Sequence, residues 1–187
     1  MKILVVSNLY PPIVFGGYEI LCHQVCQQLQ KWGHQIEVLT SDFRASECQD
    51  QAVRQLRLTT DFPLPGQSVE WVDFRLQTLQ KIGSWNYAKT IEAIERFQPD
   101  VVFCWCLSRL SLASVRAAQV RQIPVAYTIN DEHPRQFIPA HWGLGLKKSL
   151  KSVAEKWLWP LSTMRKPAFP ITIISQATRS RLLEAGL

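Results

Sequence analysis

Residues 2–20 read KILVVSNLYPPIVFGGYEI and bring an apolar run, a proline pair and a glycine pair into close succession. Within them, 3–9 is rich in β-branched and other apolar side chains, which predicts a strand buried on both faces. Gly16 and Gly17 stand just before a segment, 18–32, with the apolar spacing of a helix. Glycines let the backbone approach an anion closely, and a helix N-terminus adds unpaired N–H groups and about half a positive charge. The opening of the chain therefore predicts a strand, a loop that faces phosphate and a helix.

Strand and helix patterns alternate along the rest of the chain. The strand candidates are 3–9, 35–40, 53–58, 101–106, 124–129 and 171–175, and all but the third are nearly continuous apolar runs. Helical spacing is found in 18–32, 74–97, 110–120, 146–158 and 176–185, and Ser175 is a suitable N-cap for the last of these. Because right-handed crossovers join parallel strands through helices, we expect an α/β fold, a Rossmann-like doubly wound parallel sheet of about six or more strands flanked by helices.

The composition is that of one globular domain, since 47% of the 187 residues are apolar and 19% are charged. No apolar run approaches the roughly 20 residues that cross a bilayer, and the start lacks the features of a signal peptide, so we expect a cytoplasmic protein. The five cysteines fall mostly in predicted helices and strands, which favours reduced, buried thiols. Cys22 and Cys26 lie one helical turn apart, and Cys104 and Cys106 share a face of a predicted strand, but no further ligands accompany them and no metal site is predicted.

The formal net charge of +6 favours an anionic partner. The segment 142–156, which starts at Trp142 and ends at Lys156, combines four lysines with an apolar stripe at helical spacing. Such a helix packs its stripe on the sheet, or lies as a peripheral contact on an anionic membrane. The sequence contains no nucleic-acid recognition motif, so nucleic acid is not expected as a partner.

The order Pro11-Pro12, Gly16-Gly17, Glu19 and Gly33-His34 between two apolar strands resembles the N-terminal half of the group 1 (family 4) glycosyltransferases, which have the GT-B fold. It differs from the dinucleotide fingerprint, whose G-x-G-x-x-G follows the strand immediately. The resemblance implies that residues 1–187 are an N-terminal, acceptor-side domain, with the donor-binding domain absent from this chain. It further implies retaining transfer from a nucleotide sugar to a glycan or lipid-linked acceptor, with no metal or other cofactor and no turnover by this domain alone.

Ligands of doubly wound proteins lie beyond the carboxyl ends of the strands, so the loops there hold the candidate site residues. The resemblance implies that Gly16 and Gly17 offer backbone N–H groups to the phosphates of the nucleotide sugar. Tyr18 and Glu19, next to them, are expected to contact substrate. For Glu19 two roles stay open, a hydrogen bond to a sugar hydroxyl or to a neighbouring loop, and an acid in the first helical turn that favours the helix dipole.

Two later loops complete the expected site. Trp105 either stacks on a sugar face or lies in the core. Asn130 stands where many relatives have a histidine, and with Asp131 it is expected to position the sugar and the acceptor at the reacting centre. Glu132 and His133 follow as expected substrate contacts, while an Asx turn in which Asp131 caps a helix is the structural alternative.

Two other functions share these features and remain open. One is another nucleotide-sugar enzyme of the GT-B fold, such as an epimerase. The other is a non-catalytic module that binds an anion or a membrane surface through the glycine loop. All three interpretations require the glycine turn and the INDEHP loop, residues 129–134, to be neighbours at the carboxyl edge of the sheet.

Overall fold

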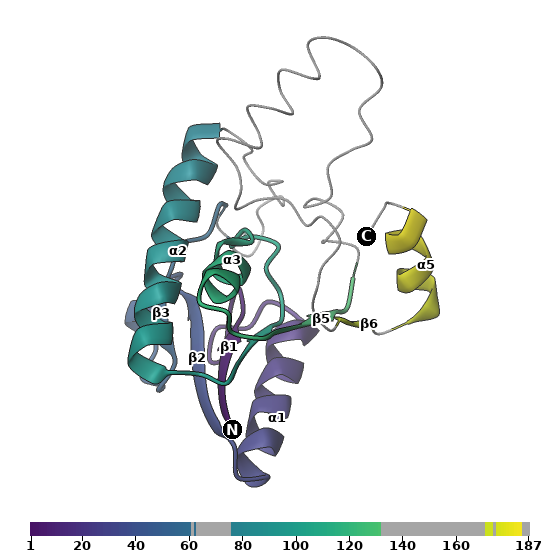
Figure 1. Ribbon diagram of the computed structural model, residues 1–187, viewed down its shortest axis with the longest axis horizontal. Helices are drawn as coiled ribbons and strands as arrows, with labels where there is room; N and C mark the ends of the chain where they lie inside the picture. The colour runs from purple at the N-terminus through teal and green to yellow at the C-terminus, as the bar shows by residue number, and fades with distance from the viewer. Residues whose placement is uncertain (61, 63–75, 132–170, 174, 185–187) are drawn as a thin grey trace.

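The computed structural model describes residues 1–60, 62, 76–131, 171–173 and 175–184 (Figure 1). Strands and helices alternate along the chain, with one short 3-10 helix, η1, between the second and third strands. Their order is β1 (Lys2–Val6), α1 (Gly17–Lys31), β2 (Gln35–Ser41), η1 (Ala45–Glu47), β3 (Val53–Leu56), α2 (Leu76–Phe97), β4 (Val101–Cys104), α3 (Ala113–Val120), β5 (Val125–Ile129), β6 (Ile171–Ile173) and α5 (Gln176–Glu184).

The six strands of the described chain form one sheet in the order β3-β2-β1-β4-β5-β6, and every neighbouring pair is parallel. From β1 the chain adds strands in one direction, and from β4 it adds them in the other. The expected Rossmann-like doubly wound sheet is confirmed. The junction between β1 and β4 is the place where the strand order reverses, and folds of this type bind their ligands beyond the carboxyl ends of the strands at that junction.

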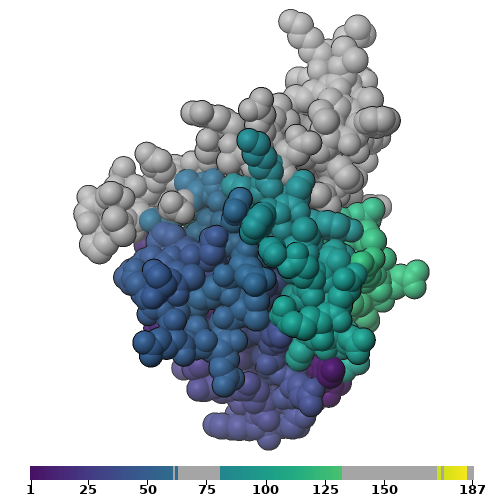
Figure 2. Space-filling view, turned by 90° about the vertical axis from the view of Figure 1, so that its left-hand side faces the viewer, coloured from purple at the N-terminus to yellow at the C-terminus, as the bar shows by residue number. Residues whose placement is uncertain are grey.

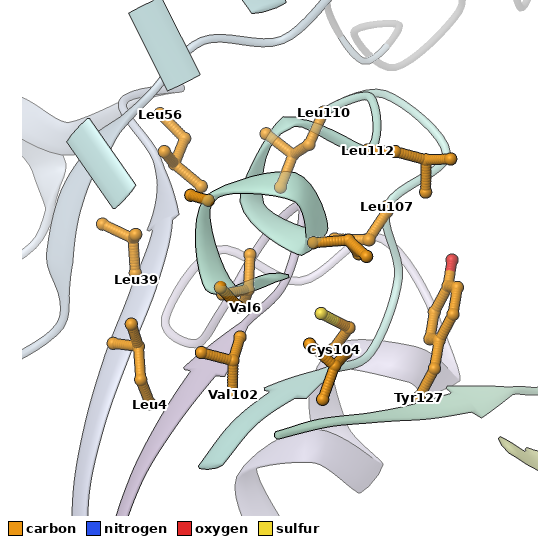
Figure 3. Packing of buried hydrophobic residues seen from close by; sticks show 14 of the residues in the cluster. Leu4, Val6, Leu39, Leu56, Val102, Cys104, Leu107, Leu110, Leu112 and Tyr127 are labelled. Atoms are coloured by element: carbon orange, nitrogen blue, oxygen red, sulfur yellow. The ribbon is translucent and has the colours of Figure 1, made fainter. Parts of the chain in front are cut away.

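Helices cover both faces of this sheet, as expected for strands that are apolar on both sides (Figure 1). Successive residues of β1 point to opposite faces: Leu4 and Val6 belong to one hydrophobic cluster, and Ile3 and Val5 to another. The larger cluster packs under α2 and α3, and Figure 3 shows its side chains from neighbouring strands meeting below α3. The smaller cluster includes Cys22 and Cys26 of α1.

The outer edge of the sheet, at β3, is closed by α2. Figure 2 shows the segment around β3, in blue, directly beside α2, in teal. The indole Nε1 of Trp85 donates to the carbonyl of Gln55 over 2.8 Å, and the guanidinium of Arg57 lies 3.7 Å from the indole ring centroid. These contacts occupy part of the exposed edge of β3, which would otherwise present unpaired backbone groups.

A buried amide fixes α2 to the loops at the carboxyl ends of β3 and β4. Asn86 is completely buried; its Oδ1 accepts from the backbone N–H of Arg57 over 2.7 Å, and its Nδ2 donates to the carbonyls of Arg57 and Leu110, each over 2.9 Å. A second buried contact joins Thr90 of α2 to Ser114 of α3 through their hydroxyl oxygens, 2.8 Å apart. Every polar group of the Asn86 side chain that faces these loops therefore has a partner.

Within the described residues each expected strand and helix has a counterpart, and the differences lie at the ends of these elements. The predicted strand 101–106 was too long, because β4 ends at Cys104; Cys106 therefore lies in the following loop and does not share a strand face with Cys104. The N-cap role of Ser175 is confirmed, since its Oγ accepts from the backbone N–H of Thr178 over 3.1 Å. The predicted helix 146–158 and the basic segment 142–156 fall outside the described residues.

All five cysteines are free thiols. Four of them are buried, and Cys48 is half-buried. Burial raises the pKa of the Cys104 thiol to about 12. Among the helices in the described parts of the chain, none combines the length and the apolar character that a membrane span requires.

Candidate active site

Asn8 joins the loops that leave β1 and β4 at the junction of the sheet. Its side chain is 1% exposed; Nδ2 donates to the Oγ of Ser108 over 2.7 Å, and Oδ1 accepts from the backbone N–H of Arg109 over 3.2 Å. Its backbone N–H donates to the carbonyl of Cys106 over 2.8 Å. The two loops are thus held together at the point where the topology places a ligand site.

The turn before α1 is fixed by the Glu19 carboxylate. Its Oε2 accepts from the backbone N–H of Gly16 over 2.8 Å and from that of Phe15 over 3.3 Å. Glu19 is only 4% exposed. The carboxylate, at the third position of the helix, therefore bonds back to its own turn, as in a capping box. A contact between Glu19 and a sugar hydroxyl stays a prediction.

Gly16 and Gly17 border open space. Gly16 is the N-cap of α1 in an extended conformation, with a φ of −163°, and it makes no side-chain cap hydrogen bond. A Cβ atom built on Gly16 or Gly17 would have no heavy atom within 4 Å outside the adjoining residues. Neither backbone strain nor crowding within the protein therefore requires glycine at these two positions. What the pair provides is a bare stretch of backbone at the N-terminus of a helix.

Tyr18 brings the glycine turn against the end of β5. Its hydroxyl oxygen accepts from the backbone N–H of Asn130 over 2.8 Å. Burial, together with the nearby Asp131 carboxylate, raises the pKa of Tyr18 well above its ordinary value. The structure thus brings Gly16, Gly17, Tyr18, Asn130 and Asp131 to one region at the carboxyl edge of the sheet. The predicted neighbours Glu132 and His133 lie outside the described residues.

Trp105 lies in the core. It is 2% exposed, belongs to the cluster under α1, and its ring centroid is 5.5 Å from that of Phe103. Its backbone N–H donates to the carbonyl of Val6 over 2.9 Å. Of the two roles left open by the sequence, the structure therefore shows the core role. Cys106, which follows it, is also buried, and this burial raises the pKa of its thiol to about 11.

Arg54 fixes the proline pair, a role that sequence reasoning missed. Its Nη2 donates to the carbonyls of Tyr10 and Pro11 over 3.0 and 2.8 Å, and to Asp50 Oδ2 over 2.6 Å. The side chain of this β3 residue is 6% exposed. The one available signal was the presence of an arginine within the least apolar of the predicted strands, where a buried charge needs partners.

Three phenylalanines from the loops after β1, β2 and β3 form a phenylalanine cluster, Phe15, Phe43 and Phe62, which the sequence analysis did not single out. The ring centroids of Phe15 and Phe62 are 5.0 Å apart, and those of Phe43 and Phe62 are 5.9 Å apart. The guanidinium of Arg109 lies 4.4 Å from the Phe62 centroid. The cluster therefore links four loops at the carboxyl edge, beside the glycine turn.

No group of three or more histidine, cysteine, aspartate or glutamate side chains suited to a metal ion occurs within the described residues. The parallel sheet and its strand order define the class, a Rossmann-like α/β domain. The comparisons with known proteins give the family. Residues 15–187 match the profile described as Glycosyltransferase Family 4, so the chain belongs to that family.

No curated protein matches the chain, whereas several solved structures resemble it. UDP-GlcNAc 2-epimerase from Neisseria meningitidis is 20% identical, with a TM-score of 0.43; the match covers 100% of this chain and 39% of the epimerase. MurG from Acinetobacter baumannii is 14% identical, with a TM-score of 0.43, over 92% of this chain and 44% of MurG. Sucrose-phosphate synthase from Thermosynechococcus elongatus is 11% identical, with a TM-score of 0.47, over 92% of this chain and 47% of the synthase. The chain thus spans less than half the length of each.

Proposed function

We propose that this chain is the acceptor-side domain of a retaining glycosyltransferase that moves a sugar from a nucleotide sugar to a glycan or lipid-linked acceptor. The observation that carries the proposal is the hydrogen bond between Tyr18 and Asn130, which brings the glycine turn next to the polar end of β5. An anion-binding backbone and sugar-binding polar groups then lie side by side, in a chain that belongs to a glycosyltransferase family.

In this proposal the glycine pair acts on the leaving group. Cleavage of the bond between the anomeric carbon and the nucleoside diphosphate passes through an oxocarbenium-like transition state, and negative charge builds up on the departing phosphate. The backbone N–H of Gly17, aided by the dipole of α1, would stabilise that charge. The N–H of Gly16 already donates to Glu19, so the expected donor role of Gly16 is not kept, and Gly16 would contribute only close access to the backbone. The open space at both glycines supports this role, because a phosphate oxygen needs close access to the backbone.

Asn130 and Asp131 hold sugar and acceptor in this scheme. Asn130 offers an amide to a hydroxyl, and Asp131 offers a carboxylate. The departing diphosphate can itself take the proton of the acceptor hydroxyl, so these residues need only to orient the reactants. We propose that the reaction uses no metal or other cofactor. Glu132 and His133 remain expected substrate contacts.

We further propose that a second Rossmann-like domain provides most contacts to the nucleotide, as in the family that the sequence resembles. The whole enzyme would act in the cytoplasm, in polysaccharide biosynthesis. Its acceptor would meet it in solution or at a membrane surface contacted by the segment from Trp142 to Lys156. Turnover then requires the full-length protein.

Substitution at Gly17 tests the proposal directly. In the full-length protein, Gly17→Ala places a methyl group in the open space beside the turn, and Gly17→Val places a larger one there. We expect Gly17→Ala to lower kcat/KM for release of nucleoside diphosphate about tenfold, and Gly17→Val to lower it further, because each side chain displaces a phosphate oxygen. The measurement is diphosphate release from a panel of UDP-, GDP- and dTDP-sugars.

Gly83→Ala is the matched control. Gly83 lies within α2, a Cβ there also meets no heavy atom within 4 Å, and the residue is remote in sequence from every proposed contact. Its substitution should leave diphosphate release unchanged. If Gly17→Val keeps full activity while remaining folded, the proposed phosphate contact is wrong. An epimerised sugar as the product would identify the alternative enzyme class.

A further inference from the structure

An aromatic ring stands exposed directly before the glycine turn. Phe15 is 55% exposed, although phenylalanine in a loop is usually covered. Its backbone is fixed, because its N–H donates to Glu19 Oε2 over 3.3 Å and the next N–H, that of Gly16, donates to the same oxygen over 2.8 Å. The exposed ring is therefore held in a defined place.

The phenylalanine cluster supports this ring from below. Phe62 lies against Phe15, with centroids 5.0 Å apart and ring planes tilted by 53°. Phe62 is in turn held by Phe43 and by the guanidinium of Arg109, whose Nη1 donates to the carbonyl of Thr60 over 3.1 Å. Arg109 itself is 9% exposed. An exposed ring backed by fixed rings loses little conformational freedom when a ligand stacks on it.

The size and the position of this surface favour one kind of ligand. A lipid surface or a protein partner needs a contiguous apolar patch of several hundred Å². Among the described residues, the exposed large apolar side chains nearest to Phe15 in the sequence are Val14, Ile20 and Leu21. Ile20, two residues before the buried Cys22, lies on the helix face that points away from the core. A single ring matches the apolar C–H face of one pyranose, whose hydroxyl groups remain free to meet polar groups at its rim.

We propose that Phe15 is the platform on which the sugar ring of the acceptor stacks, and that the phenylalanine cluster holds it in position. This inference rests on the proposed function, since it names the acceptor side of the same site. The aromatic contact that the sequence suggested for Trp105 is here made by Phe15, because Trp105 is buried and Phe15 is exposed. The ligand class is a carbohydrate, and the contact recognises its ring face.

The test measures binding of simple sugars to the full-length protein by saturation-transfer NMR. The probes are methyl α-glucoside, methyl α-mannoside, methyl α-galactoside and N-acetylglucosamine. We expect saturation of the C–H protons of one ring face for at least one probe. Phe15→Ala should raise its half-saturating concentration about tenfold, whereas Phe15→Tyr, which keeps the ring, should change it less than about threefold. Ile20→Ala, a similarly exposed apolar residue, is the matched control and should have no effect.

Two results would overturn the inference. One is the absence of saturation transfer for all four sugars, or a half-saturating concentration in Phe15→Ala that equals that of the wild-type protein. The other is a loss of sedimentation with phosphatidylglycerol vesicles in Phe15→Ala without any change in sugar binding, which would assign the ring to a lipid surface. Diphosphate release by the wild-type protein separates the two proposals. If the wild-type protein releases diphosphate but its sugar binding does not depend on Phe15, only this inference is wrong. If sugars bind through Phe15 but no diphosphate is released, only the proposed function is wrong.

Discussion

The hydroxyl of Tyr18 accepts a hydrogen bond from the backbone N–H of Asn130 across 2.8 Å, although the two residues are 112 positions apart in the chain. This bond joins the first turn of α1 to the residue that follows β5. Since parallel strands all end at the same edge of the sheet, a side chain from one loop can hold the backbone of another. The phenol of Tyr18 thus contributes to the relative placement of the two loops.

Tyr18→Phe removes this bond together with the interaction between the Tyr18 hydroxyl and the Asp131 side chain. We expect a loss of about 1 kcal/mol in the free energy of unfolding, and about fivefold faster hydrogen exchange at the Asn130 amide, because its N–H loses its partner. Urea unfolding and NMR-detected exchange measure the two effects. Unchanged protection at Asn130 would show that the bond does not hold this loop in solution.

Gly33 and Gly83 should respond to alanine with opposite signs. A Cβ at either position meets no atom within 4 Å, so space does not decide the outcome. Gly33 has a φ of +85°, where a side chain is strained, and Gly33→Ala should cost about 1 kcal/mol. Gly83 lies inside α2, and Gly83→Ala should stabilise by up to about 1 kcal/mol. Thermal unfolding of the two variants compares them directly. A higher melting temperature of Gly33→Ala would contradict the positive φ of Gly33, and a lower one of Gly83→Ala would contradict the prediction for α2.

Asn86→Ala should be among the more destabilising single substitutions in α2. It removes the partner of one buried backbone group, the carbonyl of Leu110, and of two partly buried ones, the N–H and carbonyl of Arg57. Each unsatisfied group costs about 1 to 3 kcal/mol, so we expect a total near 3 kcal/mol by urea unfolding. Ser84→Ala, at an exposed position of the same helix, is the control and should change stability by less than about 0.5 kcal/mol. A small loss in the free energy of unfolding of Asn86→Ala would mean that water takes over the hydrogen bonds of the Asn86 amide.

Stability should fall in alkaline solution because of Cys106. Burial raises the pKa of this thiol from an ordinary value of 9.0 to about 11, so between these pH values the unfolded chain releases a proton that the native protein keeps. Ionisation then favours the unfolded state, and the contribution of this thiol to the free energy of unfolding declines by about 3 kcal/mol across the window. Cys106→Ala should show a correspondingly shallower loss of stability from about pH 9 upward, with no such difference at neutral pH. Equal slopes in the two proteins would exclude Cys106 as the cause.

The sheet could be predicted from the sequence because burial on both faces leaves a direct signal. A strand such as β1, which is buried on both faces, needs apolar side chains at nearly every position. The helices that connect such strands need apolar residues on one face only. Strand ends were less accurate. Trp105 and Cys106 are as apolar as a strand and are buried, but they belong to a loop covered by α1 and by the loop after β1, so hydrophobicity continues where strand pairing has stopped.

The sequence predicted several individual residues of the candidate site, but it did not predict the contacts that join its loops. The spacing of Gly16, Gly17 and Glu19 marked the turn, since glycines before a helix and an acid in its first turn have local causes. The contacts of Asn8 and Arg54 join loops whose relative placement depends on the whole sheet, and no periodicity encodes them. Phe15, Phe43 and Phe62 each follow a different strand, and only the finished sheet brings them together.

The junction between β1 and β4 also has a consequence for how the chain acquires its structure. Residues 2–56 contain β1, β2 and β3, and residues 101–173 contain β4, β5 and β6. The pairings within each trio, of which Tyr127 with Ile171 spans the most chain, therefore join residues closer in sequence than the pairing between the trios. The seam between the two trios is the pairing of β1 with β4, in which Ile3 lies opposite Val101. Because these residues are far apart in the sequence, this pairing carries a higher entropic cost of loop closure than the pairings within each trio. We expect the two trios to form first and the seam to close last, with Asn8 as the residue whose hydrogen bonds complete that late step.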